Sequence, residues 1–310
     1  MSVRWGVLGA GWIVQQATAQ AIHDAPRARL AAVASRDLER ARRVNPERAY
    51  DQYQHVLDDD SVDAVYIALA NDQHTPWIHR AIAAGKHVLC EKPLTLTLED
   101  TQAAFQAADA AGVLLVEAAW SMWHPRMQRI AQLARTGALG PIQHFLGTFT
   151  FEGVPDGNYR LDPALGGGAL LDIGVYPLHA LVACLSDITQ VRPEIERVTG
   201  GLGVDMTTKA RLDLGADRHA SIVASFAMPE SQRLMVRGSS GQVRVPDDQA
   251  FTTWREATSL EVGETVETFA PTDAYRDMFE AVSGRILGRD DWLLAPERSL
   301  QVAQLVDALR

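Results

Sequence analysis

The start of the chain has the pattern strand, glycine turn, helix, and this pattern restricts the fold more than any other feature. An apolar run from Val3 to Leu8 is followed by Gly9-Ala10-Gly11, and a helical pattern then extends to Asp24. The first glycine permits a tight turn, and the second lets the backbone approach a pyrophosphate at the helix N-terminus. The pattern predicts a dinucleotide site, with a plain glycine turn as the alternative, although Val14 is bulky for the third small position. The predicted contacts are Gly9, Gly11, Trp12 and Ile13.

Short apolar runs alternate with helical stretches through the first 120 residues. The runs over 29–34, 62–69, 87–90 and 113–117 contain few polar residues. Strands that are buried on both faces have this composition, and the helical stretches between them supply the crossovers of a parallel sheet. We therefore expect an N-terminal α/β domain over residues 1–120, with a doubly wound parallel sheet.

The pattern changes after Trp120. Segments of alternating apolar and polar residues dominate, as in HFLGTFTFE, HASIVASFAM and AFTTWRE. Gly238-Ser239-Ser240-Gly241 separates two such segments and predicts a hairpin. Two helical patterns, over 273–287 and 296–310, close the chain. Residues 121–310 are therefore predicted to form an α+β domain for substrate binding and oligomerisation, with an open, mainly antiparallel sheet.

Charge and cysteine content exclude several classes of protein. The 310 residues include 29 basic and 39 acidic side chains, and the pI is about 5.4. Nucleic acids and anionic membranes bind clustered basic surfaces, so neither is an expected partner. The only cysteines are Cys90 and Cys184, and no apolar run has the length of about 18 residues that spans a membrane. We expect a cytoplasmic protein, and because the nine histidines lack metal-ligand spacing, no metal is predicted.

The residues after the second predicted strand bear on the choice of cofactor. An enzyme that binds NAD usually places a carboxylate at this strand end, beside the adenosine ribose. Here the strand leads into Ser35-Arg36-Asp37, so the carboxylate comes two positions later. A hydroxyl and a guanidinium suit a 2′-phosphate, which arginine binds through two hydrogen bonds. Ser35 and Arg36 therefore favour NADP, with NAD as the alternative if Arg36 only begins a solvated helix.

Further motifs together resemble one known family. They are Cys90-Glu91-Lys92-Pro93-Leu94, the stretch from Tyr66 to His74, Glu117-Ala118-Ala119-Trp120, and the stretch from Gly166 to Tyr176. With the N-terminal glycine turn, they resemble the glucose–fructose oxidoreductase/inositol dehydrogenase (Gfo/Idh/MocA) family, in particular its branch of dihydrodiol and NADP-dependent xylose dehydrogenases. The resemblance implies a Rossmann domain, a second domain whose open sheet often mediates dimerisation, and hydride transfer between nicotinamide and a sugar-like or cyclic alcohol. Ser121-Met122-Trp123-His124 departs from the Arg-Phe-Phe of many relatives, so the substrate is not identified.

Lys92 is the residue most directly placed for chemistry. It follows the strand predicted at 87–90, and open parallel sheets bind their ligands beyond the carboxyl ends of the strands. Its ammonium would stabilise an alkoxide-like transition state and relay a proton while nicotinamide takes the hydride. Lys92 is therefore predicted to be catalytic, and Glu91 to contact the cofactor ribose. The alternative for Lys92 is a surface lysine at a strand end.

Three polar residues after a triple glycine are spaced for one helical stripe. Asp172, Tyr176 and His179 stand at i, i+4 and i+7, and Pro177 predicts a helix start or kink between them. As the resemblance implies, the Tyr176 phenol serves as acid or base beside Lys92. Asp172 is predicted to be catalytic by orienting the substrate or tuning that lysine, and His179 to contact the substrate. The alternatives are helix packing for Tyr176 and His179 and a cap for Asp172.

Five weaker candidates complete the predicted site. Asn71 and His74 follow the third core strand, where relatives contact the cofactor, with a helix cap as the alternative. Trp120, Tyr159 and Arg160 are candidates to line a sugar pocket through stacking and hydrogen bonds, with ordinary core or surface positions as the alternative.

The sequence as a whole predicts an NADP-dependent oxidoreductase that acts on a sugar or a related cyclic alcohol. The alternatives are a trans-dihydrodiol dehydrogenase and a non-catalytic dinucleotide sensor, and the presence of Lys92 argues against the sensor. An open sheet with one uncovered face would expose an apolar patch, so a homodimer or a dimer of dimers is expected.

Overall fold

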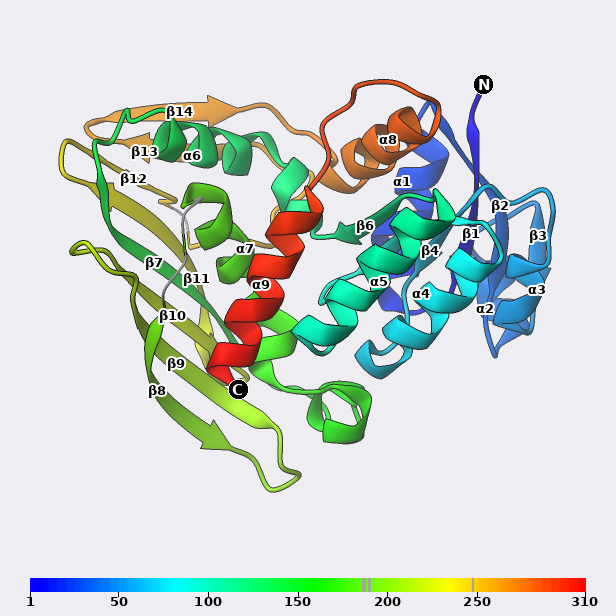
Figure 1. The fold of residues 1–310 in the computed structure, drawn as a ribbon, viewed down its shortest axis with the longest axis horizontal. Coiled ribbons are helices and arrows are strands. Elements are labelled where there is room, and N and C mark those ends of the chain that lie inside the picture. The colour runs from blue at the N-terminus through cyan, green and yellow to red at the C-terminus, as the bar shows by residue number, and fades with distance from the viewer. Residues whose placement is uncertain (186–187, 189–190, 247) are drawn as a thin grey trace. The chain divides into compact units, whose positions relative to one another are not determined.

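The computed structural model of the chain describes residues 1–185, 188, 191–246 and 248–310 (Figure 1). These residues divide into two units, each built around one sheet. The first unit comprises Met1–Trp120 and Asp273–Pro296, and the second comprises Ser121–Thr272 and Glu297–Arg310. The segment Asp273–Pro296, which the sequence pattern placed in the second domain, thus belongs to the first unit.

The sheet of the first unit has six parallel strands in the order β3-β2-β1-β4-β5-β6. This is a doubly wound sheet, in which the strand order reverses between β1 and β4. Ligands of such sheets bind at this reversal, beyond the carboxyl ends of the strands. The strands are β1 (Val3–Leu8), β2 (Ala28–Ala34), β3 (Arg48–Tyr50), β4 (Ala64–Ile67), β5 (His87–Glu91) and β6 (Leu115–Ala118).

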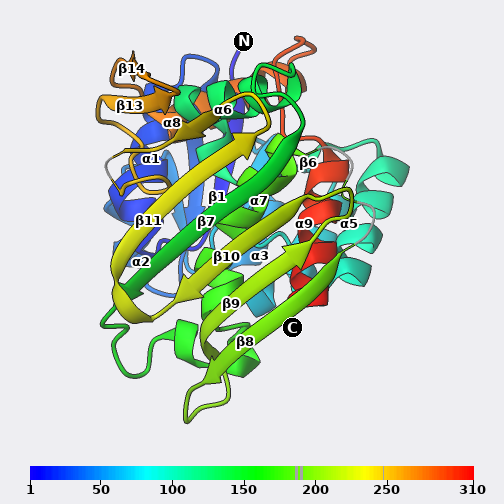
Figure 2. The same cartoon turned by 90° about the vertical axis from the view of Figure 1, so that its left-hand side faces the viewer.

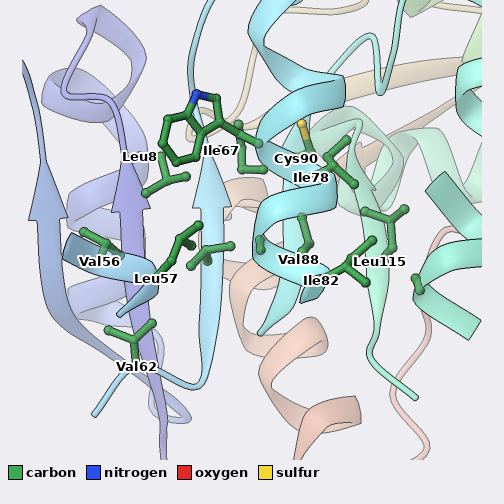
Figure 3. Packing of buried hydrophobic residues seen from close by; sticks show 14 of the residues in the cluster. Leu8, Val56, Leu57, Val62, Ile67, Ile78, Ile82, Val88, Cys90 and Leu115 are labelled. Carbon is green, nitrogen blue, oxygen red and sulfur yellow. The ribbon is translucent and has the colours of Figure 1, made fainter. Parts of the chain in front are cut away.

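Helices pack on this sheet through apolar faces with helical spacing. In α4, Ile78 and Ile82 are one turn apart and are packed with Ile67 and Val88 of the sheet, as Figure 3 shows. The helical segments are η1 (Val14–Thr18), α1 (Ala19–Asp24), α2 (Leu38–Arg42), α3 (Tyr53–Leu57), η2 (Asn71–Gln73), α4 (His74–Ala83), α5 (Leu98–Ala111), α8 (Ala274–Ile286) and, at the boundary of the units, η3 (Trp120–Trp123).

Aromatic packing explains why α8 belongs to the first unit. The Phe279 ring meets Trp5 of β1 and Tyr66 of β4 edge-on, with ring centroids 5.1 Å and 5.2 Å apart. All three side chains are fully buried. Because these partners are far apart in the sequence, no local sequence pattern predicts the contact.

The sheet of the second unit has eight strands in the order β14-β13-β12-β11-β7-β10-β9-β8. β7 and β10 pair in parallel, and the other strand pairs are antiparallel. This mainly antiparallel sheet and the Rossmann-like first sheet confirm the predicted fold class. The strands are β7 (Ile142–Glu152), β8 (Arg192–Thr199), β9 (Asp205–Asp213), β10 (His219–Ser225), β11 (Ala227–Gly238), β12 (Gln242–Arg244), β13 (Thr258–Val262) and β14 (Thr265–Phe269).

In the second unit, α6 (Pro125–Arg135), η6 (Leu170–Gly174) and α7 (Val175–Cys184) pack against one face of the sheet. A Cβ atom on Gly147 of β7 would lie 2.4 Å from Cβ of Pro177, so the glycine permits the close approach of α7. Figure 2 shows the other face of the sheet, which no helix covers in the described part of this unit. The helical segments are α6 (Pro125–Arg135), η4 (Tyr159–Leu161), η5 (Pro163–Leu165), η6 (Leu170–Gly174), α7 (Val175–Cys184) and α9 (Pro296–Leu309).

Parts of the secondary structure differ from the sequence pattern. β3, α3, β8 and β13 are elements that the sequence pattern did not predict. Residues 250–256, predicted as an alternating segment, form turns instead. There the backbone N–H of Phe251 donates to Gln232 Oε1 at 3.0 Å, and the Phe251 ring is buried. A side-chain acceptor thus replaces the ladder bond that a strand would have formed.

One described segment, Pro163–Cys184, has the length and hydropathy of a membrane-spanning helix. However, 89% of its most apolar window is buried inside the protein, as in the core helix of a globular domain.

Candidate active site

The turn after β1 has the geometry that a bound pyrophosphate requires. Gly9 has a φ of +99°, and a Cβ atom there would lie 2.4 Å from the Ala68 carbonyl oxygen. A larger residue would therefore be strained and would clash. A Cβ atom on Gly11 would meet no described atom within 4 Å, so the backbone is open to a ligand on that side. Both glycines fit the dinucleotide site.

The helix after this turn begins with the π-helical segment η1. Val14, the bulky residue at the third glycine position, is fully buried there. Trp12 is 68% exposed and Ile13 is half-buried, so the indole remains accessible to a ligand.

After β2, the Arg36 guanidinium is accessible to solvent, whereas the Asp37 carboxylate is already hydrogen-bonded. Arg36 is exposed, whereas Ser35 is buried. Asp37 caps α2, because its Oδ1 accepts a hydrogen bond from the Arg40 N–H at 3.1 Å. The Asp37 N–H donates to Ser35 Oγ at 3.3 Å. A carboxylate that caps a helix is less available to a ribose, and this favours a 2′-phosphate beside Arg36.

The ends of β4 and β5 carry several predicted residues. Asn71 is buried and begins η2 shortly after β4. Glu91 ends β5, where it accepts hydrogen bonds from the Tyr66 hydroxyl and, at 3.3 Å, from the Lys92 N–H. Lys92 is half-buried, and its peptide bond to the following proline is cis. The fold thus brings Glu91 and Lys92 to the sheet edge at which doubly wound sheets bind ligands.

His74 lies behind this edge. It is fully buried, with Nδ1 2.8 Å from the Pro93 carbonyl oxygen and Nε2 3.2 Å from the Leu69 carbonyl oxygen. Burial holds the pKa of His74 below its usual value, and the positive charge of Lys92 acts in the same direction. This burial and the contacts with two backbone carbonyl oxygens favour a structural residue over one that touches the cofactor.

Glu117 of β6 is absent from the predicted site residues but lies at the same edge. Its side chain is 2% exposed, and its Oε1 accepts a hydrogen bond from the Leu94 N–H at 3.0 Å. A buried carboxylate costs free energy unless it is hydrogen-bonded. The available signal was a single carboxylate inside the otherwise apolar run over 113–119.

In the second unit, Asp172 forms an ion pair with Arg160. The Arg160 Nε lies 2.6 Å from Asp172 Oδ2, and the Asp172 side chain is almost fully buried. The Arg160 guanidinium lies over the Tyr159 ring, 4.8 Å from its centroid. Burial alone would lower the pKa of Arg160, but the Asp172 carboxylate, together with Tyr159 and Tyr176, more than offsets the effect of burial and raises the pKa. Three predicted residues are thus together, and the ion pair suits Asp172 for orienting groups rather than for accepting a proton.

Tyr176 and His179 lie on one continuous helical stretch with Asp172, because η6 leads directly into α7. α7 begins two residues before Pro177, where the sequence predicted a helix start or kink. Pro177 has no N–H to donate to the preceding helical turn, and it lies where the π-helical segment η6 has just changed to the α-helix.

The surroundings of Tyr176 and His179 differ. The half-buried Tyr176 ring packs against Phe149 and Phe251, with ring centroids 5.4 Å and 6.1 Å apart. His179 is 3% exposed on a helix that is otherwise apolar. This burial favours the packing alternative for His179.

Trp120 is also a packing residue in this structure. Its ring stacks on Tyr275 of α8, with centroids 4.9 Å apart and planes 28° apart, and it is 2% exposed. The core alternative is therefore favoured over a sugar contact.

The two thiols are inert in this structure. Cys90 and Cys184 are free and buried. Burial raises the pKa of Cys184 to about 12 and that of Cys90 well above its usual value, so both stay protonated at neutral pH. Among the described residues, no three His, Cys, Asp or Glu side chains are grouped as metal ligands.

Comparison with known proteins identifies the class of this chain. The model of an oxidoreductase family with an NAD-binding Rossmann fold, GFO_IDH_MocA, matches residues 3–118, and the GFO/IDH/MocA C-terminal domain model matches residues 127–244. The chain belongs to the Gfo/Idh/MocA family. The predicted family is confirmed, as is the prediction of a nicotinamide-dependent oxidoreductase.

Individual relatives of this chain include two dehydrogenases. An NADP-dependent D-xylose 1-dehydrogenase of Haloferax volcanii is 35% identical, and the match covers 98% of this chain and 95% of the relative. A trans-1,2-dihydrobenzene-1,2-diol dehydrogenase of Mus musculus is 30% identical over 79% of this chain and 75% of its own.

A crystal structure of a 3-ketoreductase from Actinomadura kijaniata with NADP and TDP-benzene has a TM-score of 0.88 and 31% identity. The match covers 100% of this chain and 97% of the ketoreductase. That enzyme was also crystallised with one tyrosine replaced by phenylalanine and with one lysine replaced by alanine.

Proposed function

We propose that this protein is an NADP-dependent oxidoreductase that transfers hydride between nicotinamide and a carbon of a sugar or sugar-like alcohol. The observation that carries the proposal is that one parallel sheet has the Gly9 turn at the carboxyl end of β1 and Lys92 at the carboxyl end of β5. The relatives that act with NADP support the predicted cofactor. Ser35 and Arg36 would bind its 2′-phosphate, and the exposure of Arg36 supports this role.

We propose that Lys92 and Tyr176 handle the proton of the substrate hydroxyl. The lysine and tyrosine replaced in the ketoreductase are 84 positions apart along that chain, and so are Lys92 and Tyr176 here. NADP supplies the hydride acceptor or donor when bound. The Lys92 ammonium stabilises negative charge on the substrate oxygen, and the Tyr176 hydroxyl exchanges its proton with that oxygen. Asp172 and Arg160 orient the substrate as an ion pair.

A trans-dihydrodiol dehydrogenase is the second candidate, because one such enzyme is 30% identical over 79% of this chain. The formation of NADPH at 340 nm would be measured with a panel of aldoses, cyclic polyols and trans-dihydrodiols. Turnover with aldoses supports the first candidate, and turnover with the diols alone supports the second. No formation of NADPH with any of them would favour a non-catalytic sensor.

The choice of cofactor is tested by Arg36→Ala. If the guanidinium binds the 2′-phosphate, the variant should bind NADP several-fold to about 100-fold more weakly, because a charge-assisted contact contributes ~1–3 kcal/mol. The affinity for NAD should change little. Both dissociation constants would be measured by fluorescence titration, with the exposed Arg43 replaced by alanine as the control. An equal loss for both cofactors would show that Arg36 does not select NADP.

We further propose that the chain forms a dimer in the cytoplasm through the open face of the second sheet. This face is mixed rather than the apolar patch expected from the sequence, because Leu146 and Val223 lie among charged residues of neighbouring strands. Burial lowers the pKa of His144, and the nearby charges of Arg237, His219 and Arg211 act in the same direction. The edge strand β8 presents Glu194 and Glu196. Positive and negative regions on one face are complementary to the same face of a second copy of the chain.

The buried free thiols support the proposed cytoplasmic location, because a reducing compartment keeps thiols free.

The dimer is expected to have a mass of twice 33.9 kDa by light scattering at micromolar concentration. Arg237→Glu should weaken it, since the substitution places like charges against the acidic edge, whereas Arg43→Glu on the first unit should not. A 33.9 kDa species for the unaltered protein would refute the association.

A further inference from the structure

The turn that carries Lys92 is held by side chains rather than by the sheet. Beyond the end of β5, its backbone groups lie outside the strand ladder. The Lys92 N–H donates to Glu91 Oε2 at 3.3 Å, and the Leu94 N–H donates to Glu117 Oε1 at 3.0 Å. Between them, the Pro93 carbonyl oxygen faces His74 Nδ1 at 2.8 Å. Three successive residues are therefore each bound by a titratable side chain.

The side chains that hold this turn come from three elements and are secured in the interior. His74 of α4 is fully buried and Glu117 of β6 is 2% exposed. Glu91 is held in turn by the hydroxyl of Tyr66, which is fully buried on β4. Buried polar groups raise the free energy of the folded state unless they are hydrogen-bonded, and each of these three side chains makes at least one such bond or close contact.

The two contacts of His74 connect neighbouring strand ends. Its Nδ1 faces the loop after β5, and its Nε2 lies 3.2 Å from the Leu69 carbonyl oxygen in the loop after β4. A neutral imidazole has a single N–H, and with its proton on Nδ1 it donates the shorter contact, to the Pro93 carbonyl oxygen, while Nε2 lies beside the Leu69 carbonyl oxygen without a hydrogen bond. His74 thus binds the Lys92 turn by a hydrogen bond and packs against the loop after β4, whose Ala68 carbonyl oxygen would meet a Cβ on Gly9.

We propose that His74 and Glu117 are positioning residues for Lys92: they fix the backbone of residues 92–94 so that the ammonium is presented to the substrate oxygen at a constant position. The inference rests on the proposed function of Lys92. A displacement of about 1 Å in a reacting group is enough to lower the rate about 100-fold. The contacts are to backbone rather than to ligand, so cofactor affinity should depend on them little.

Pairs of variants separate the hydrogen bond from the side chain as such. Glu117→Gln keeps an oxygen that accepts from Leu94, whereas Glu117→Ala removes it. His74→Asn keeps an N–H close to the position of Nδ1, whereas His74→Leu removes it. The alanine and leucine variants should lower kcat about 10- to 100-fold, with Kd for NADP within about threefold. The glutamine and asparagine variants should recover most of kcat.

Residue-resolved amide exchange provides a readout that is independent of activity. The Leu94 amide should exchange slowly in the unaltered protein and in Glu117→Gln, and much faster in Glu117→Ala, at temperatures where thermal melting shows each variant folded. Unchanged Leu94 exchange in Glu117→Ala would refute the hold on the turn. Faster exchange with full kcat, or a glutamine variant as slow as the alanine variant, would refute positioning through this bond.

Failure of the proposed function has a different signature. If Lys92→Ala retained full turnover, Lys92 would not take part in the chemistry. Both the proposed role of Lys92 and the positioning proposal would then be refuted. If Lys92→Ala is inactive but the Leu94 amide exchanges at the same rate in Glu117→Ala as in the unaltered protein, only the positioning proposal is refuted.

Discussion

Lys92→Ala is expected to lower kcat by about 100- to 10,000-fold, the usual contribution of general acid–base catalysis. The ammonium stabilises negative charge on the substrate oxygen mainly in the transition state, so its loss should affect kcat far more than binding. Lys92 lies at the end of β5 and the glycine turn follows β1, so the truncation leaves the phosphate-binding backbone intact. The Kd for NADP should therefore stay near that of the unaltered protein.

Single-turnover kinetics with the best substrate of the panel would measure the chemical step, and a fluorescence titration would measure NADP binding. Lys92→Arg serves as the matched variant, because arginine keeps a positive charge but does not give up a proton at neutral pH. Partial recovery in Lys92→Arg would assign the recovered part to charge alone. Full turnover in Lys92→Ala would remove the residue from the chemistry.

The first unit could be predicted from the sequence because its signals are local. Val3–Leu8 followed by two glycines and a helix is a pattern of some 20 residues, and each later strand is an apolar run of its own. The placement of α8 was not accessible in this way. It depends on the contact of Phe279 with Trp5 and Tyr66, which stand far earlier in the chain and belong to different strands. Nothing in the neighbourhood of Phe279 encodes these partners.

The site shows the same division between local and distant signals. Gly9 and Lys92 were identified because a turn or a strand end is visible in the sequence itself. The pairing of Arg160 with Asp172 and the contact of Glu117 with Leu94 form only when separate elements meet. For His74, the sequence showed a polar residue at a strand end but not that both ring nitrogens would face backbone carbonyls in the interior.

Tyr176→Phe is expected to lower kcat by about 100- to 10,000-fold while the unit keeps its stability. The substitution removes only the hydroxyl, and the phenylalanine ring retains the packing against Phe149 and Phe251. If Tyr176 served packing alone, the variant would turn over like the unaltered protein. Thermal melting and kcat measured on the same preparation therefore separate a chemical role from a structural one.

The double variant Lys92→Ala/Tyr176→Phe completes this test. If both side chains handle one proton on one substrate oxygen, removal of the second should cost little once the first is gone, because residues that act as a unit are strongly non-additive. Its kcat should lie close to that of the slower single variant. A double variant whose loss equals the product of the two single losses would show that the residues act independently. Full activity of Tyr176→Phe would leave Lys92 as the proton-handling group, and His179 would be the next residue to replace.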